Sequence, residues 1–487
     1  MYAPLCWGRA PARERVHSRC SVRRCGRQAH IVDNFSWPER GEGMKMASWV
    51  PVWFVAVIWV VATAAPARSD EGSVPSALFD YVSRPENVFA WQLREKRQLS
   101  AGVLYDVDLT SQRWQGIVWK HALQVYEPAR IAYPRHVLLF VTGGENGRRP
   151  RGGDRELGMQ LATMTGARVA MLFQVPNQPL LDGRKEDDLI SETWLRYLAT
   201  GDARWPLLFP MVKSAMKAMD AVEQLATAHW QATVEAFVIT GASKRGWTSW
   251  LTAVADPRVM ATAPIVIDVL NFQPQMQHQL DIWGEFSEQI HDYTSKGLIK
   301  LADETPREIQ LRRMMDPFTY RQKLTLPKLI INGTNDRYWV VDATRFYWHE
   351  LVGPKYLLQV PNAGHGLEGG RDLAMGTLAA FFRHVVSGRS MPAVRWDHGE
   401  DVDDLLLRIR STPRPREARL WVARSLDRDF RDAVWTDRPM SRQGETYSGR
   451  VAKPRRGYVA LFGQLDFTAD GLDSSLSTLI RRFPENR

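Results

Sequence analysis

The sequence predicts an α/β protein: a mostly parallel sheet covered by helices on both faces, followed by a small C-terminal β-sandwich-like module. Two patterns in the 487-residue chain lead to this prediction. Short, continuously apolar runs alternate with helical patterns between about residues 136 and 390, as they do when parallel strands are buried on both faces. Beyond Gly388, apolar residues alternate with polar ones, which is typical of strands with one buried face. The apolar runs are 137–144, 167–173, 234–241, 261–268, 327–333 and 355–360.

The segments around these runs carry further patterns. Residues 72–135 alternate aromatic and polar side chains, which predicts antiparallel strands that lead into the sheet. Residues 208–228 have the apolar spacing of a helix that lies on a sheet. Residues 271–325 are longer than a crossover requires, so we predict a helical cap there, over the strand ends. A second insertion, 177–207, is expected to face the cap across the same cleft.

Length and composition indicate a folded protein with more than one unit. A single hydrophobic core usually stops growing near ~250 to 300 residues. Hydrophobic residues make up 44% of this chain and charged residues 24%, which argues against a disordered chain and against a membrane protein with many spans. We therefore predict a main α/β domain over residues 72–390 and a β-rich module over residues 391–487.

An apolar segment precedes the predicted domains. Residues 47–62 are a run of sixteen residues without a charge, with a lysine before it and small residues after it. This order is typical of a secretory signal peptide, and the run is short for a membrane span. We predict a signal peptide at 44–67 and a secreted or periplasmic protein; an uncleaved membrane anchor is the alternative. Translation is then expected to begin at Met44 or Met46, which makes residues 1–43 a non-native or disordered extension.

Charge and cysteine content argue against several classes of partner. The net charge is +10, but residues 1–67 hold nine Lys/Arg and four Asp/Glu, so the remainder carries only +5. So mild a charge, without a basic run, predicts no nucleic-acid partner. The three cysteines are Cys6, Cys20 and Cys25, so the main body has no thiolate ligand and no disulfide. No cluster has the spacing of metal ligands, and we predict neither a metal nor a cofactor. The sequence predicts no particular oligomeric state.

The strongest local motif is a strand-to-helix turn at VITGASKRGW, residues 238–247. In such a turn the central residue is strained and projects into a cleft, and small neighbours, here Gly241 and Gly246, relieve the crowding. The spacing Gly-x-Ser-x-x-Gly is one residue longer than the common hydrolase pattern. An ordinary N-cap serine is therefore the alternative to a nucleophile at Ser243.

Two later runs are followed by residues that can activate a serine. The fifth apolar run leads to Asp336 and the sixth to His365. Proteins with the α/β-hydrolase fold use the chain order Ser, acid, His, with the last two groups after the final strands. His365 would accept the proton of Ser243, and Asp336 would orient the imidazole. Turn residues are the alternative at both positions, and Asp268, which closes the preceding strand, is a competing acid.

Further candidates would bind an oxyanion or the substrate. The N–H of Lys244 and an N–H of Gly143 or Gly144, in the loop after the first run, are expected to form an oxyanion hole. Lys244 and Arg245 oppose the dipole of the helix that they begin, unless a negative group lies near. A substrate carboxylate and an acidic side chain of the protein are the two alternatives. The candidate substrate-binding residues are Arg245, Trp247, Trp283 and Trp339, with core or cap packing as the alternative for the tryptophans.

Several long motifs in this order resemble the PhoPQ-activated pathogenicity-related protein family. They are GASKRGW (241–247), DPRV (256–259), PIVIDVLN (264–271), GTNDRYW (333–339), VPNAGH (360–365) and RDFRDAVW (428–435). The resemblance starts at about residue 75 and covers most of the chain. It implies an exported α/β-hydrolase-fold protein associated with bacterial virulence, with Ser243, Asp336 and His365 at the positions of the family's expected triad. The turn is also similar to that of certain carbohydrate esterases with a basic residue after the serine.

Three functions remain open at this stage. The first is a secreted serine hydrolase that cleaves an ester, thioester or amide of a small molecule or peptide through an acyl-serine intermediate. The second is a serine peptidase, because the same triad hydrolyses peptides and selectivity resides in the cleft. The third is a non-catalytic secreted binding or signalling protein that uses the C-terminal module as its contact surface, because a fold alone never establishes activity.

Overall fold

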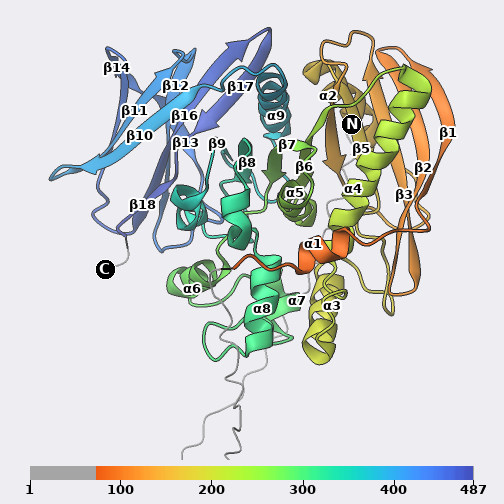
Figure 1. Ribbon diagram of the computed structural model, residues 1–487. Coiled ribbons are helices and arrows are strands. Elements are labelled where there is room, and N and C mark those ends of the chain that lie inside the picture. The colour runs from red at the N-terminus through yellow and green to blue at the C-terminus, as the bar shows by residue number, and fades with distance from the viewer. Residues whose placement is uncertain (1–72, 486–487) are drawn as a thin grey trace, which may run out of the picture. The chain divides into compact units, whose positions relative to one another are not determined.

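The computed structural model describes residues 73–485, so the predictions for 1–43 and for a signal peptide at 44–67 lie outside the described residues. The main sheet has nine strands in the order β1-β2-β3-β5-β4-β6-β7-β8-β9 (Figure 1). Its strands are β1 (Ala90–Leu99), β2 (Gly102–Trp114), β3 (Ile117–Pro128), β4 (His136–Val141), β5 (Arg168–Leu172), β6 (Ala236–Ala242), β7 (Val259–Ile265), β8 (Lys328–Gly333) and β9 (Lys355–Val360).

The sheet is antiparallel at one edge and parallel in the rest. Strands β1, β2, β3 and β5 pair antiparallel in that order. From β5 through β4, β6, β7 and β8 to β9 every pairing is parallel. The carboxyl ends of β6, β8 and β9 therefore lie along the same edge of the sheet. This arrangement confirms the predicted α/β-hydrolase fold, including the antiparallel entry over residues 72–135.

Helices cover both faces of the sheet because successive side chains of each parallel strand point to opposite faces. In β4, Val137 and Leu139 belong to the apolar cluster that includes α4 and α5, whereas Leu138 and Phe140 belong to the cluster that includes α2 and α9. The helix predicted at 208–228 is α4, which continues into a π-helical turn at Ala226–Trp230. The helices of these layers are α1 (Ala77–Val82), α2 (Gly152–Thr165), α4 (Leu208–Leu225), α5 (Lys244–Ala255) and α9 (Arg371–Val386).

The two predicted insertions are helical and contact each other. The insertion between β7 and β8 forms the cap, and the insertion between β5 and α4 contributes α3. The rings of Trp194 on α3 and Tyr293 in the cap lie 5.1 Å apart. The helices concerned are α3 (Glu186–Thr200), α6 (Phe272–Trp283), α7 (His291–Thr294) and α8 (Pro306–Met315), with 3-10 turns at Glu288–Ile290 and Pro317–Lys323. Within residues 73–485, no helix is both long and apolar enough to cross a membrane.

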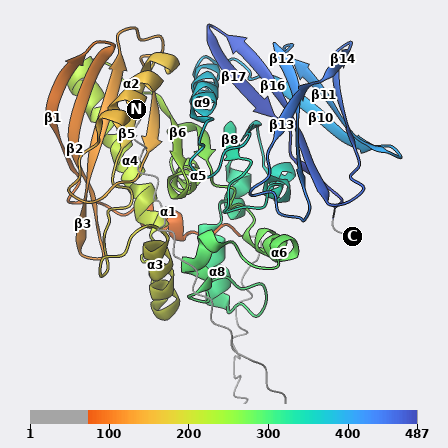
Figure 2. The ribbon, with the colours of Figure 1, turned by 180° about the vertical axis from the view of Figure 1, so that it is seen from behind.

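The C-terminal strands form two antiparallel sheets beside α9, next to the β9 edge of the main sheet (Figures 1 and 2). One has the order β10-β11-β15-β14; the other has β13-β12-β16-β17, with β18 also on β16. Leu405, Leu420 and Leu461 of this module belong to the same apolar cluster as α9, so the module packs firmly on the main sheet. Its strands are β10 (Ala393–Glu400), β11 (Asp404–Thr412), β12 (Glu417–Ser425), β13 (Thr436–Pro439), β14 (Ser441–Gln443), β15 (Thr446–Ala452), β16 (Tyr458–Ala469), β17 (Leu472–Ser477) and β18 (Arg481–Phe483).

Candidate active site

Ser243 lies in a strained turn between the end of β6 and the start of α5. Its φ of 56° and ψ of −127° lie outside the regions that a serine ordinarily adopts. The two flanking glycines make this turn sterically feasible. A Cβ on Gly241 would lie 2.6 Å from the carbonyl oxygen of Arg245, and a Cβ on Gly246 would lie 2.7 Å from a methyl carbon of Ile267. The longer Gly-x-Ser-x-x-Gly spacing therefore still builds the sharp turn of a nucleophile elbow.

His365 connects Ser243 to Asp336. The distance from His365 Nε2 to Ser243 Oγ is 2.8 Å, and that from His365 Nδ1 to Asp336 Oδ2 is 2.7 Å. In the neutral tautomer that fits both contacts, Nδ1–H donates to the carboxylate and Nε2 accepts from the serine hydroxyl. The other oxygen of Asp336 accepts from the backbone N–H of Tyr338 at 3.0 Å. The loops after β6, β8 and β9 thus bring together the three residues expected to form a triad.

Asp268, the competing acid, has other partners. Its carboxylate accepts hydrogen bonds from Thr344 Oγ1, at 2.8 Å, and from the hydroxyl of Tyr347. Burial raises the pKa of Asp268 to about 6, and the charge of Asp336 adds to this rise. The structure therefore places Asp336, and not Asp268, on the imidazole.

The candidate oxyanion donors occupy two different environments. Lys244 is the first residue of α5, where backbone N–H groups have no partner within the helix, and it lines the same pocket as Ser243. Gly143 lies against the guanidinium of Arg245, which occupies the space where a Cβ would be. Gly144 has a φ of 125°, which favours glycine, and lies near Gln174. Neither glycine is among the residues that line the pocket in front of Ser243.

The side chains of Lys244 and Arg245 pair with the first turn of α3. Arg245 donates two hydrogen bonds to Glu186, at 2.7 and 2.8 Å, and a third to the carbonyl oxygen of Val175 at 2.6 Å. Lys244 Nζ lies 3.0 Å from Asp187 Oδ2 and 3.4 Å from Glu186 Oε2. An acidic side chain of the protein therefore binds the guanidinium of Arg245, which is the alternative left open by the sequence, and Arg245 is not among the residues that line the pocket in front of Ser243.

This pairing governs the protonation of the charged groups. Burial by itself would raise the pKa of Glu186, but the attraction of Arg245 and Lys244 outweighs it and holds this pKa well below its usual value. Burial would lower the pKa of Lys244, but Asp187 and Glu186 keep it above its usual value. Glu186 and Lys244 are therefore both charged at neutral pH.

The candidate tryptophans fall into two places. Trp247 and Trp339 line the pocket in front of Ser243. Trp283 does not; it lines a small cavity together with Asp336, and the guanidinium carbon of Arg431 is 4.3 Å from its ring centroid. Trp283 is therefore separate from the pocket in front of Ser243, and its contact with Arg431 is the packing alternative.

Residues 430–435 of the C-terminal module hold the loops that carry Asp336 and His365. The amide nitrogen of Asn335 donates to the carbonyl oxygens of Ala433, at 2.7 Å, and Arg431, at 3.2 Å. The side chain of Asn362 accepts from the N–H of Trp435 at 2.7 Å and donates to its carbonyl oxygen at 2.9 Å. One segment of the module thus fixes the residue beside Asp336 and a residue of the turn that leads to His365.

The sequence patterns did not predict several side chains near Ser243. They are Glu186, Asp187, Tyr293 and Tyr338. Three consecutive acids at 186–188 begin α3, and they were the available signal for a partner of the Lys244-Arg245 pair. Tyr338 lies two residues after Asp336 and its ring is 4.3 Å from that of His365. Within the described range 73–485, no group of three or more His, Cys, Asp or Glu side chains is arranged to hold a metal ion.

The Glu186–Arg245 pair gives a pH-dependent prediction. Replacing Glu186 with Gln leaves buried cations undercompensated, and we expect the free energy of unfolding at pH 7 to fall by about 3 kcal/mol. The low folded-state pKa means that Glu186 contributes its full stability above the unfolded-state value of about 4.3 and loses it as the pH falls further. Denaturant titrations should therefore show a gap between wild type and Glu186→Gln that narrows below about pH 4.

A surface ion pair supplies the control for this experiment. The side chain of Glu350 is 54% exposed, and its Oε2 lies 3.2 Å from Nη2 of Arg321. Glu350→Gln should therefore change the free energy of unfolding by less than about 1 kcal/mol. A Glu186→Gln effect as small as that of the control, or one that is constant from pH 7 to pH 3, contradicts the described role of the pair.

The contacts of residues 430–435 give a second prediction. Asn335→Ala removes the donor shared by these carbonyl oxygens, and we expect a loss of about 1 to 3 kcal/mol in the free energy of unfolding. Hydrogen–deuterium exchange should become faster in residues 333–338, while β5, in the interior of the sheet, stays protected. Asn87→Ala, at an exposed asparagine, is the matched control. Unchanged exchange in residues 333–338 would show that the module does not hold this loop.

Comparison with known proteins identifies relatives of this chain. The family model described as PhoPQ-activated pathogenicity-related protein matches residues 78–431. A Dictyostelium discoideum protein, "Autocrine proliferation repressor protein A", is 31% identical over 426 residues, which are 80% of this chain and 85% of that protein.

Solved structures give weaker likenesses. Acetyl xylan esterase 1 from Thermoanaerobacterium sp. JW/SL YS485 has a TM-score of 0.43 and 17% identity, over 63% of this chain and 95% of that one. The acylaminoacyl peptidase of Pyrococcus horikoshii has a TM-score of 0.38 and 14% identity, over 64% of this chain and 51% of that one. Neither likeness is strong enough to indicate a function. The family model and the Dictyostelium relative, in contrast, each span well over half of the sequence, and the chain belongs to the PhoPQ-activated pathogenicity-related protein family.

Proposed function

We propose that this protein is a serine hydrolase that cleaves an ester, thioester or amide through an acyl intermediate on Ser243. The observation that carries the proposal is the simultaneous hydrogen bonding of His365 to Ser243 and to Asp336. A serine hydroxyl is a weak nucleophile unless an adjacent base accepts its proton. The strain at Ser243 and the glycines around it supply a second, independent indication, because strained serines of this kind are a feature of nucleophile elbows.

In the proposed reaction, Ser243 Oγ attacks the substrate carbonyl while His365 Nε2 accepts its proton. The N–H of Lys244 donates to the oxyanion that forms, and the backbone of Gly143 or Gly144 is the candidate for the second donor. The imidazolium, stabilised by Asp336, then gives the proton to the leaving group. Water then attacks the carbonyl of the acyl-serine while His365 accepts its proton. The imidazolium returns this proton to Ser243 Oγ as the acyl group leaves as a carboxylic acid. Every group in these steps belongs to the protein, so the proposed reaction requires no cofactor.

A serine peptidase and a non-catalytic signalling protein are the two alternative functions. A serine peptidase uses the same three groups and differs only in the substrate that the pocket accepts. The name of the Dictyostelium relative describes a proliferation repressor, which favours a non-catalytic signalling role as the second candidate. The description of the family associates its members with pathogenicity, and a role in virulence is proposed on that ground alone.

A fluorophosphonate probe distinguishes catalysis from the non-catalytic alternative. We expect folded wild type to be labelled and Ser243→Ala to remain unlabelled, with Ser441→Ala, at an exposed serine, labelled like wild type. Without Asp336 the imidazole loses its orientation, so Asp336→Asn should lower kcat on an activated ester by about 10³- to 10⁴-fold.

The competing acid supplies the internal comparison. Asp268 bonds to Thr344 and Tyr347 and not to His365, so Asp268→Asn is expected to lower kcat by less than about 10-fold. The reverse ranking of the two aspartates would refute the assignment of Asp336. Folded protein that takes up no label at all would support the non-catalytic candidate.

We further propose that the protein is exported through residues 44–67. Small residues at Ala62-Thr63-Ala64 and Ala65-Pro66-Ala67 are suited to cleavage by a signal peptidase. Mass spectrometry of the exported protein should find its N-terminus directly after Ala64 or Ala67, and arginine at both alanines should block this processing. A membrane-bound protein that keeps residues 47–62 would show instead that the segment is an anchor.

A further inference from the structure

The pocket in front of Ser243 is almost entirely apolar. Among the described residues that line it, Asp187 and Lys244 are the charged side chains beside His365. Six aromatic side chains form much of its wall: Trp194, Trp247, Phe272, Tyr293, Tyr338 and Trp339. Trp194 and Trp247 meet edge to face at 6.0 Å, which makes this wall stiff and leaves apolar ring surface toward the site.

The charges in the pocket are satisfied within the protein. Asp187 forms the ion pair with Lys244 and also accepts hydrogen bonds from the hydroxyls of Tyr293, at 2.9 Å, and Tyr338, at 3.3 Å. A charged substrate group would have to displace one of these contacts and lose its own hydration. An apolar group, in contrast, gains free energy by leaving water.

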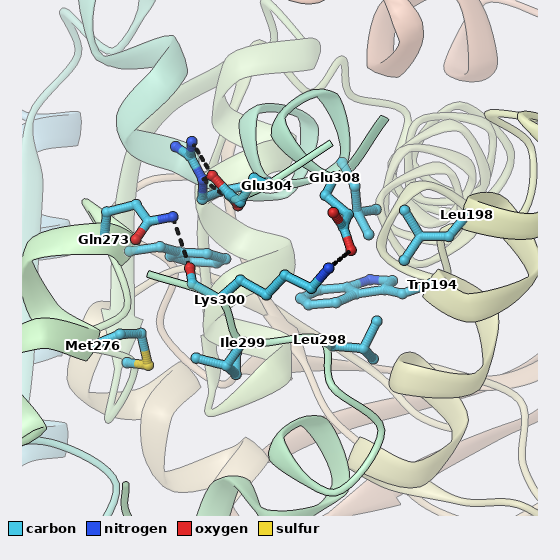
Figure 3. Close-up of a pocket in the computed structure, with 12 residues that line it drawn as sticks. Trp194, Leu198, Gln273, Met276, Leu298, Ile299, Lys300, Glu304 and Glu308 are labelled. Atoms are coloured by element: carbon cyan, nitrogen blue, oxygen red, sulfur yellow. Dashed lines mark hydrogen bonds and ion pairs between the residues drawn. The ribbon is translucent and has the colours of Figure 1, made fainter. Parts of the chain in front are cut away.

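A second cavity lies between α3, α6 and α8 (Figure 3). Its charged side chains pair with one another: Lys300 with Glu308 and Arg312 with Glu304, each at 2.7 Å. Trp194, Phe272, Met276 and Ile299 line both this cavity and the pocket in front of Ser243. The two spaces are therefore neighbours, separated by a thin apolar wall.

We infer that the substrate carries an uncharged, apolar acyl group of medium length, and that Met276 and Ile299 set the longest chain that the pocket accepts. The inference rests on the proposed hydrolase function. An acyl group bound to Ser243 extends along the aromatic wall until it meets these two side chains. Shortening either one joins the pocket to the second cavity, which gives a longer chain room to continue in an apolar environment.

A series of p-nitrophenyl esters, from acetate to dodecanoate, tests this inference. Each buried methylene should raise kcat/KM of wild type about fourfold until the pocket is full, after which kcat/KM falls. Ile299→Ala and Met276→Ala should move the optimum to chains longer by about two or more methylenes. Ile299 is only partly buried, so its variant provides the result if Met276→Ala does not fold. Leu198→Ala is the matched control, because Leu198 lines the second cavity alone and its loss should leave the optimum unchanged.

Fluorophosphonate labelling of the same preparations separates the two levels of the proposal. Labelled protein that prefers acetate, or prefers a charged acyl group such as succinate, overturns the inference while the hydrolase function stands. So does labelled protein whose kcat/KM does not change with the length of the acyl group. Folded protein that is not labelled overturns the hydrolase function, and the inference with it.

Discussion

The two hydrogen bonds of His365 depend on three loops, after β6, β8 and β9, that meet at the carboxyl edge of the sheet. The parallel pairing of β6 through β9 places the ends of these strands along the same edge, but strand pairing fixes only where each loop begins. Asn335 and Asn362 then tie the loops that carry Asp336 and His365 to residues 430–435. A hydrogen bond weakens steeply when it lengthens or bends, so the C-terminal module, far along the chain, takes part in holding the site.

Contacts between distant segments also neutralise the charges next to Ser243. The turn places Lys244 and Arg245 at the positive end of the α5 dipole, which is unfavourable by itself. Glu186 and Asp187, at the start of α3, neutralise both cations. The ion pairs therefore join the insertion at 177–207 to the helix that begins at Ser243. They also remove the free positive charge that would otherwise have favoured an anionic substrate.

The cap contributes much of the wall of the pocket in front of Ser243. Its contribution is apolar, and the charged residues of α8 and of the preceding loop bond to one another beside the second cavity. Burial of apolar surface is non-directional and roughly proportional to area, so a pocket of this kind discriminates by the size and shape of a group.

The sequence by itself determined the order of strands and helices, the turn at Ser243, and the two later loops that carry Asp336 and His365. These features are local. The apolar runs indicate strands that are buried on both faces, and the glycines are required because a side chain would clash with residues a few positions away. The choice between Asp336 and Asp268 was not local, because both close buried strands, and only the fold showed that Thr344 and Tyr347 bind the second.

The partners of Arg245 and Trp283 were likewise decided by tertiary structure. Their residue types are suited to ligand binding, but Glu186 and Arg431, distant in the sequence, bind them in the folded chain. Sequence patterns report what a side chain is able to do. Which partner satisfies that side chain depends on segments that meet only when the chain folds, and this is why the positions of Ser243, Asp336 and His365 were predictable while the network around them was not.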